Sequence, residues 1–356
     1  FTEVASELGE KARCDTINFK QRDTLVEGVK KNHARNIAGV IKTGWQGLNR
    51  SLGKAGGFVA GESVFINALP HQYKTGLLVT IALSALIYND LKAEKPGKIP
   101  LVYFGSLENE TFQNMIWIFK KLYYKETGRQ PTNLKDEQVV EWLTNYFAKF
   151  GAELIIDRFI PSDFGYDEFK ARIEALGEAV YEVKMAVVDY VNLMKMTGAD
   201  GHASKAGRHH DICILVRNLC TYCKNKGITF VSAHPLNRDA MRLESLSTGN
   251  VVLKFGPEHL AESMDIEREV DVSFYLHLEY NHAGVRFCTM RINKHRYVDD
   301  TPKAHQFFAM PFHPDGVGIL DDLGGSPGYV TDIQTYGMAD VDNANDNHQI
   351  STAAVY

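Results

Sequence analysis

Short, continuous runs of apolar residues alternate with helical stretches along the middle of the chain, and this alternation constrains the fold more than any other feature. A strand covered on both faces of a sheet has such a continuous run, and the helices between runs provide the crossovers that parallel strands need. We therefore predict an α/β protein with a doubly wound, mostly parallel sheet. The runs are SVFINAL (63–69), IPLVYFGSL (99–107), ELIIDRF (153–159), KMAVVDYVNLM (184–194) and GITFVSAH (227–234).

The segments on either side of this core have other patterns. VDVSFYLHLEY (270–280) and VRFCTMRINKHR (285–296) alternate apolar and polar residues, which predicts antiparallel strands at the edge of the sheet. Residues 16–40 have the pattern of a polar helix, and the residues from about 323 onward have no periodicity. The expected division is an N-terminal linker helix region (1–40), the α/β domain (41–322) and a flexible acidic tail (323–356).

Composition limits the kinds of function open to the chain. The net charge of −5 argues against a surface coated with basic residues, so a nucleic-acid site would have to be local. No apolar run approaches the ~18 residues of a membrane span, and no membrane partner is expected. Cys220 and Cys223 form a CxxC without a second pair at zinc spacing, which favours buried thiols on a helix. These features are those expected of a cytoplasmic protein. If a virus encodes the chain, the cytoplasm would be that of the host cell.

The run at 63–69 leads through ALPHQYKTG into an apolar helix, the strand–loop–helix order of a phosphate-binding loop. Lys74 and Thr75 stand at the start of that helix, where free backbone N–H groups and the helix dipole favour phosphate. Lys74 would neutralise phosphate charge, and the Thr75 hydroxyl would bind Mg²⁺. Ala68 and Tyr73 fill the glycine positions of G-x-x-x-x-G-K-[ST]. The residues predicted to surround the nucleotide are Ala68, Pro70, His71, Gln72, Tyr73, Lys74, Thr75 and Gly76.

Acidic residues end two of the later predicted strands. Glu108 comes directly after the run at 99–107, and Asp189 lies where the run at 184–194 ends its apolar part. Acids at the carboxyl ends of parallel strands face the crevice in which nucleotides bind. We expect Asp189 to support Mg²⁺ together with Thr75, and Glu108 to activate the attacking water.

Several motifs, taken in order, resemble those of DnaB-family replicative helicases. TGWQGLNRSLGKAGGFVAGE (43–62) resembles the segment that leads into that family's phosphate loop, and Ala68 and Pro70 match the start of the loop. FGSLENE, VVDYVNLM, SAHPLNRDA and LAESMDIEREVDVSFYLHLE resemble the later strands. INKHRY resembles a Lys-x-Arg motif that reaches the ATP site of a neighbouring subunit. The His234–Pro235 pair resembles the His-Pro pair at this position in the Twinkle and phage primase-helicase branch of the family.

This resemblance implies a RecA-like ATPase domain that hydrolyses ATP with Mg²⁺ and moves along single-stranded DNA during DNA replication. The ATP sites would lie between subunits of a hexameric ring, with His234 sensing the γ-phosphate and Lys294 and Arg296 acting on the neighbouring site. The further partners that it implies are a primase, a polymerase or a helicase loader.

Basic residues in the segments after Asp189 and after His234 are candidates for DNA contact. The resemblance implies that both segments line a central pore and bind the phosphates of single-stranded DNA. The candidates are Lys195, Lys205, Arg208, Arg238, Arg242 and Lys254.

Two other functions remain open at this point. A RecA-like recombinase or recombination mediator would share the nucleotide core but form open filaments on DNA. A non-catalytic nucleotide- or DNA-binding subunit is the other alternative, because Ala68 and Tyr73 replace the loop glycines.

Overall fold

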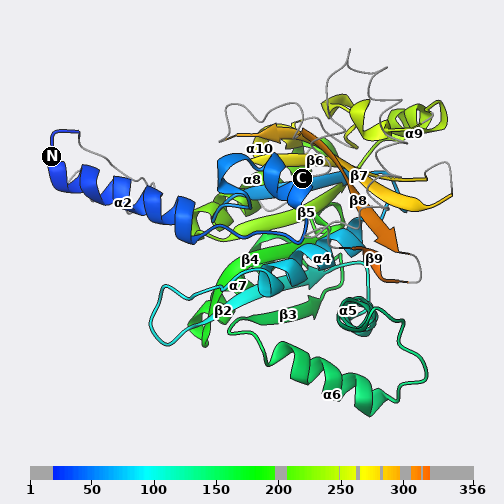
Figure 1. Cartoon of the computed structure of the whole chain (residues 1–356). Helices are drawn as coiled ribbons and strands as arrows, with labels where there is room; N and C mark the ends of the chain where they lie inside the picture. Colours follow the sequence, from blue (N-terminus) through cyan, green and yellow to red (C-terminus); the bar gives the residue numbers. More distant parts are fainter. Residues whose placement is uncertain are drawn as a thin grey trace. The chain divides into compact units, whose positions relative to one another are not determined.

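The computed structural model describes residues 19–196, 207–247, 249–261, 265–280, 284–296, 306–313 and 316–320. The chain divides into two compact units, Phe1–Val40 and Ile41–Tyr356. In the first, the helix α2 (Arg22–Ala38) occupies the segment in which a polar helix was expected (Figure 1). The acidic tail expected at 323–356 lies outside the described residues, so its prediction stays a prediction.

The second unit contains one sheet, to which the described residues contribute nine strands. The first six strands in its order, from β3 to β6, are all parallel, and β6 to β9 continue the sheet with antiparallel pairs (Figure 1). This confirms the expected doubly wound, mostly parallel sheet. The order is β3 (Glu153–Arg158), β2 (Ile99–Ser106), β4 (Tyr181–Asp189), β5 (Thr229–Pro235), β1 (Ser63–Ala68), β6 (Val272–Tyr280), β7 (Arg286–His295), β8 (Phe307–His313) and β9 (Gly318–Ile319).

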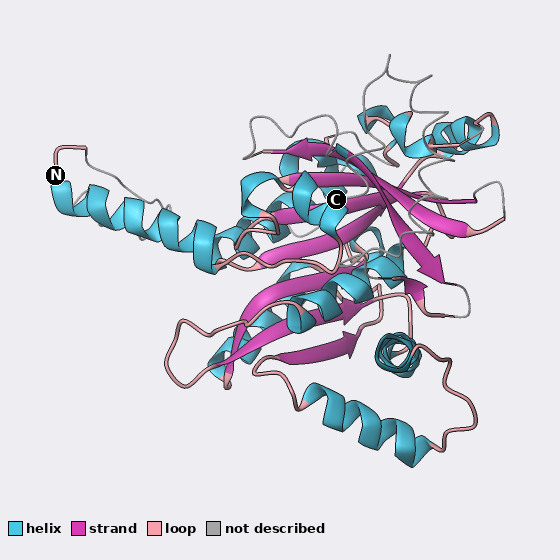
Figure 2. Cartoon of the chain, viewed as in Figure 1, coloured by secondary structure: helices cyan, strands magenta, loops and turns pink. Residues whose placement is uncertain are grey.

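Helices cover both faces of the parallel part of the sheet, which is why its strands are apolar at consecutive positions (Figure 2). In β1, Val64 and Ile66 pack into one hydrophobic cluster, whereas Phe65 packs into the other. The first cluster includes residues of α3 (Gln46–Ser51), α4 (Lys74–Ile87), α5 (Thr111–Thr127) and α6 (Asp136–Phe147), and the second those of α7 (Tyr166–Glu178), α8 (Arg208–Lys226) and α10 (Ile266–Glu269). Two-sided burial of this kind stabilises a layered α/β domain.

The antiparallel part of the sheet extends further than the sequence pattern indicated. β6 and β7 pair as expected, but β8 pairs with β7 along Phe287–Arg291, and β9 pairs with β8. Pro311 lies inside β8, and a proline in an apolar run argues against a strand, so the run FFAMPFH was not recognised. β9 has only two residues and no periodicity to detect.

Two further expectations concern burial and membranes. Cys220 and Cys223 are free, buried thiols on α8, as the CxxC spacing on a helix indicated. In the part of the chain that the structure describes, no helix combines the length and the apolarity that crossing a membrane requires.

The parallel direction of β1, β2, β4 and β5 brings their carboxyl ends to one edge of the sheet. Ser106 of β2 is level with Asp189 of β4, and Asn67 of β1 is level with His234 of β5. The loops that leave this edge carry most of the predicted site residues, so the topology assembles the candidate site there.

Candidate functional site

The predicted phosphate loop, called the phosphate loop below, joins the end of β1 to the start of α4, although its glycine positions are filled. β1 ends at Ala68, and α4 begins at Lys74. Between them, His71 and Tyr73 both have φ angles of 61°, in the left-handed region that glycine adopts most readily. The backbone therefore makes its tight turn at Tyr73, where the phosphate-loop pattern has a glycine.

The Tyr73 side chain is packed into the domain in a way that supports this turn. Its ring meets that of Phe312 on β8 edge to face, with 5.0 Å between the ring centroids. A Cβ on Gly76 would lie 2.1 Å from Tyr73 Cζ, and one on Gly318 would lie 1.5 Å from its hydroxyl oxygen. The ring fits only because both neighbours are glycines. The left-handed backbone costs a residue with a Cβ roughly 1–2 kcal/mol, which this packing offsets.

Lys74 lies folded against its own loop. Its Nζ donates to the carbonyl oxygens of Leu69 at 2.8 Å and Ala68 at 3.3 Å. Burial lowers the pKa of Lys74, while the charges of Glu108 and Asp189 raise it in part. The ammonium is thus placed inside the loop, where phosphate oxygens are stronger partners than the carbonyls that it now contacts.

Thr75, Glu108 and Asp189 come together beside this loop. The Thr75 hydroxyl donates to Asp189 Oδ1 at 3.1 Å and lies 3.4 Å from Glu108 Oε2. Asp189 is fully buried, whereas Glu108 is exposed to solvent. These residues are far apart in the sequence, and the neighbouring strands β2 and β4 bring the two carboxylates to the first turn of α4.

The surroundings of Asp189 suit a hard cation. Burial raises the pKa of Asp189 to about 7, and the charge of Glu108 also raises it, against the hydrogen bond from Thr75 and the charge of Lys74. Its second oxygen, Oδ2, is buried without a hydrogen-bond partner among the described residues. A carboxylate oxygen in this state, next to a threonine hydroxyl, fits Mg²⁺, which prefers oxygen ligands.

Asp189→Asn is expected to stabilise the ligand-free protein more at pH 8 than at pH 5. The folded-state pKa of about 7 lies above the ordinary value of 3.8, so the carboxyl favours folding at low pH and loses this contribution as the pH rises to about 7. The amide has no such loss and still accepts the Thr75 hydrogen bond. Since one pKa unit corresponds to about 1.4 kcal/mol, the gain at pH 8 is several kcal/mol at most. Thermal melting in EDTA across this pH range measures it.

The exposed Asp163 offers the control for this experiment. Asp163→Asn removes a carboxylate from the surface and is expected to leave the pH dependence of melting as in the wild type. If Asp189→Asn changed the melting temperature equally at pH 5 and pH 8, Asp189 would not titrate in this range.

His234 is fully buried at the end of β5. Its Nε2 lies 2.7 Å from the Ala261 carbonyl oxygen, and its Nδ1 lies 2.8 Å from Asn192 Oδ1. A carbonyl can only accept, so Nε2 carries a proton. The backbone carbonyl of Asn192 accepts from the Arg208 guanidinium at 3.0 Å. His234 is therefore connected through Asn192, a residue that the sequence analysis did not single out, to a predicted DNA-contact residue.

Lys294 and Arg296 lie away from the phosphate loop of the same chain. Lys294 Nζ donates to the Glu267 carbonyl, and Arg296 forms an ion pair of 3.1 Å with Asp271. The Asp271 carboxylate also accepts from the Ser63 N–H, at the beginning of β1. Lys74 follows the other end of β1, whose six residues span roughly 20 Å at ~3.3 Å each. Arg296 thus lies near the amino end of β1, whereas Lys74 lies near its carboxyl end.

The predicted DNA-contact residues that the structure describes form two groups near the carboxyl ends of the strands. Lys195 and Arg208 are exposed on either side of residues 197–206, and Lys205 itself lies outside the described residues. Arg238 and Arg242 are exposed on the helix α9 (Arg238–Ser245), where Arg242 pairs with Asp239 at 3.1 Å. The exposed Lys254 donates to Ser247 Oγ at 3.2 Å. Because β4 and β5 are neighbours, both groups follow strands that end next to the Thr75 cluster.

Glu244 on α9 also contacts the site, and the sequence analysis missed it. Its Oε1 accepts from Gln72 Nε2 in the phosphate loop at 3.2 Å. No local pattern separates Glu244 from other carboxylates on polar helices, and the two residues are 172 positions apart. Only the tertiary arrangement identifies this contact.

Solved structures with a similar fold include that of a replicative helicase. This structure, described as a DnaB-like replicative helicase and its interactions with primase, has a TM-score of 0.61 and 16% identity, and covers 90% of this chain and 70% of its own. A second structure, described as an ATPase domain, has a TM-score of 0.60 and 15% identity, and covers 86% of this chain and 99% of its own. These likenesses confirm the expected RecA-like fold.

Comparison with curated protein sequences gave no match. The family model of the divergent DnaB-like ATPases, in contrast, matches residues 1–340. This match covers nearly the whole chain and confirms the resemblance to DnaB-type helicases that the motifs indicated. The chain therefore belongs to the family of divergent DnaB-like ATPases.

Proposed function

We propose that this protein hydrolyses ATP with Mg²⁺ and uses the energy to move along single-stranded DNA, as the motor of a replicative helicase. The observation that carries the proposal is the meeting of Thr75, Asp189 and Glu108 beside Lys74 at the carboxyl edge of the sheet. A lysine and a threonine at a helix start, with two carboxylates from neighbouring strands, make up the parts that phosphoryl transfer to water requires.

Each of these residues has a separate task in the proposed reaction. Lys74 exchanges the Ala68 and Leu69 carbonyls for phosphate oxygens of ATP. Thr75 and Asp189 would hold Mg²⁺, which supplies positive charge to the phosphates when bound. Glu108 is exposed and close to Thr75, so it can accept a proton from a water that attacks the γ-phosphorus. The water oxygen bonds to phosphorus, the bond to the bridging oxygen breaks, and ADP and phosphate leave.

The position of Arg296 supports ATP sites between subunits. On its own subunit Arg296 lies at the start of β1, whereas the phosphate loop lies at its end. An arginine that acts on phosphates from this position must act on a neighbour. We therefore propose a ring, hexameric as the family resemblance implies, with Lys294 and Arg296 facing the next ATP site and His234 sensing the γ-phosphate through Asn192.

Phosphate release by the wild-type protein, with and without an oligo(dT) strand, tests the proposal. The expected result is Mg²⁺-dependent hydrolysis that the strand accelerates. Binding of ATP without any turnover would instead favour a non-catalytic subunit. Negative-stain images with ATP and DNA distinguish closed rings from the open filaments of a recombinase. Pull-down with a primase, a polymerase or a helicase loader tests the other proposed partners.

Glu108→Gln is expected to bind ATP and DNA normally but to hydrolyse ATP ~10²–10⁴-fold more slowly. The amide keeps the size of the side chain and cannot accept the proton of the attacking water. Single-turnover hydrolysis gives the rate, and equilibrium titration with a fluorescent ATP analogue gives the affinity.

Glu110→Gln is a matched control two residues away. Glu110 is also exposed but pairs with Arg158 at 3.2 Å, outside the Thr75 cluster. Its variant is expected to hydrolyse ATP at the wild-type rate. Loss of ATP binding in Glu108→Gln would show that this carboxylate binds the metal or supports the fold, and would contradict its proposed role.

A further inference from the structure

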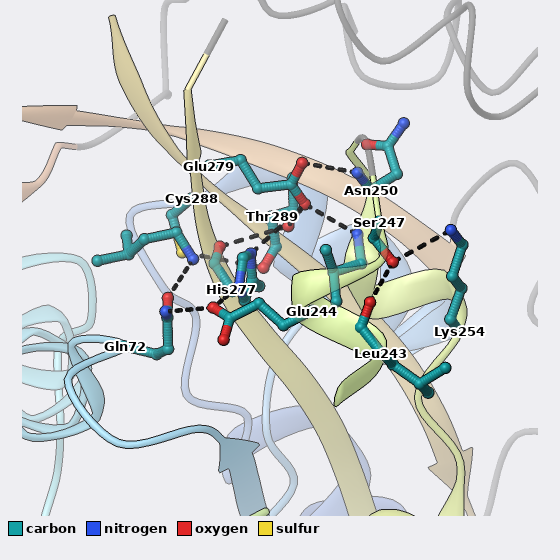
Figure 3. Close-up of polar contacts among 12 residues, drawn as sticks. Gln72, Leu243, Glu244, Ser247, Asn250, Lys254, His277, Glu279, Cys288 and Thr289 are labelled. Carbon is teal, nitrogen blue, oxygen red and sulfur yellow. Dashed lines mark hydrogen bonds and ion pairs between the residues drawn. The ribbon is translucent and has the colours of Figure 1, made fainter. Parts of the chain in front are cut away.

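The phosphate loop is joined to α9 by a side chain that the proposed chemistry does not use. Gln72 Nε2 donates to Glu244 Oε1 on α9 at 3.2 Å, and Gln72 Oε1 accepts from the Leu278 N–H on β6 at 2.7 Å (Figure 3). Gln72 lies between His71 and Tyr73, the two left-handed residues of the loop. Any change in the path of the loop therefore changes the position of the Gln72 side chain.

Glu244 is held from a second side by a buried histidine. His277 Nε2 on β6 lies 2.7 Å from the same Glu244 oxygen, and the His277 residue is 6% exposed (Figure 3). Burial lowers the pKa of His277, but contacts with Glu279 and Glu244 raise it overall above its ordinary value. Glu244 thus takes part in a charge-assisted contact with the sheet and in a hydrogen bond with the loop.

The segment that follows α9 is attached to the same place on β6. Glu279 accepts from the backbone N–H groups of Asn250 at 2.6 Å and Val251 at 3.1 Å, and from the Thr289 hydroxyl at 2.9 Å (Figure 3). Glu279 is itself 4% exposed, so this attachment is shielded from water. This segment is fixed to β6 through Glu279, and α9 is connected through Glu244 both to His277 on β6 and to Gln72 in the loop.

Apolar packing supports the same connection. Leu69 at the start of the phosphate loop lies in one hydrophobic cluster with Ala240 of α9 and Tyr275 of β6. α9 carries Arg238, Met241 and Arg242 as exposed residues, and the exposed Leu246 follows the helix directly. The helix therefore has one side on the phosphate loop and another side available to a polyanion.

We propose that Glu244 is a positioning residue through which ATP and single-stranded DNA influence each other's binding. This rests on the proposed function. When phosphates withdraw Lys74 from the Ala68 and Leu69 carbonyls, the loop shifts, and Gln72 transmits the shift to Glu244 and α9. The position of the arginines on α9 then depends on the nucleotide. Couplings of this kind change affinity by about 5–150-fold, and the effect is reciprocal.

The experiment measures the dissociation constant of a fluorescent oligo(dT) strand by anisotropy, with and without a non-hydrolysable ATP analogue. For the wild type, the ratio of the two constants is expected within about 5–150. For Glu244→Ala, the ratio is expected to fall to about 1, while the affinity for the analogue alone stays within a few-fold of wild type. Reciprocity demands that the effect of DNA on the affinity for the analogue disappear as well.

Asp239→Asn is the matched control, because it removes a negative charge from α9 on the exposed side, where Asp239 pairs with Arg242. It is expected to change DNA affinity equally in both states and to leave the ratio unchanged. A helix that is only destabilised would behave in the same way, so the ratio separates positioning from general damage. Should Glu244→Ala fail to fold, Gln72→Leu breaks the connection from the loop side and is also expected to lose the ratio.

Three results would overturn the inference. If Glu244→Ala or Gln72→Leu keeps the ratio of DNA dissociation constants measured for the wild type, the connection does not transmit the effect of the nucleotide. If the wild-type protein binds both ligands but its two dissociation constants for DNA are equal, the proposed coupling is contradicted and the proposed function is not. A wild-type protein that binds neither ligand contradicts the proposed function itself.

Discussion

Lys74→Ala is expected to abolish ATP hydrolysis and to leave the fold intact. Lys74 is the cation that the phosphate loop itself provides, and its Nζ donates to two backbone carbonyls. Without it, the charge that develops on the transferred phosphoryl group lacks a partner, and loss of one such donor costs about 10²–10³-fold in rate or more. Phosphate release measures the activity, and far-UV circular dichroism with thermal melting checks the fold.

Lys98→Ala is a control with the same kind of contact. Lys98 also donates to two backbone carbonyls, those of Gly177 and Ala179, but its amine lies outside the phosphate loop. The Lys98→Ala protein is expected to hydrolyse ATP at the wild-type rate. If Lys74→Ala did so too, the assignment of the phosphate loop would be wrong.

Arg296→Ala is expected to retain ATP binding and to lose hydrolysis by ~10³–10⁵-fold, the range of arginines that act on a phosphoryl transition state. Arg296 lies beside Asp271 and the start of β1, so we expect its effect to be on the ATP site of a neighbouring subunit. The alternative is an arginine that only stabilises its surroundings through Asp271. Loss of such a partly exposed pair costs at most about 1 kcal/mol and leaves activity unchanged.

A mixing experiment separates these alternatives. Arg296→Ala and Lys74→Ala subunits are each inactive alone, but a mixed ring contains some interfaces that pair an intact Lys74 with an intact Arg296. Partial recovery of hydrolysis is therefore expected once subunits exchange, and labelled subunits can verify the exchange. No recovery at any ratio would remove the main support for sites between subunits.

Arg217→Ala serves as the control for general loss of an ion pair. Arg217 contacts Glu269 through two hydrogen bonds of 3.1 and 2.7 Å on the surface of α8 and α10. The Arg217→Ala protein is expected to have a slightly lower melting temperature than the wild type and to hydrolyse ATP at the wild-type rate. A comparable loss of activity in Arg217→Ala would attribute the Arg296 effect to stability.

The nature and the place of the strands could be predicted from the sequence because burial on two faces leaves a local signature. The run at 63–69 is buried at every position of β1, and its odd and even residues enter different clusters. The chemistry of the candidate site was also visible locally. Lys74 and Thr75 begin a helix after a strand, Glu108 follows β2 and Asp189 ends β4, so their place at one edge followed from parallel pairing.

The distances within the site depended on tertiary structure. Thr75 on α4, which follows β1, meets Asp189 only because the order of the strands separates β4 from β1 by β5 alone, and no short-range pattern specifies that order. Tertiary structure also decides β8. Its Pro311 argues against a strand in the sequence pattern, but pairing with β7 stabilises the strand.

Tyr73 shows most clearly what each level determined. By itself the sequence established that a bulky residue fills the position of a phosphate-loop glycine. The compensating residues are Gly76, one turn away, and Gly318 in β9, the last strand of the sheet in chain order. Whether a left-handed tyrosine is tolerated is a matter of steric fit between segments distant in sequence, and such fit exists only in the folded protein. The same reason explains why Glu244 was recognised as a partner of Gln72 only from the structure.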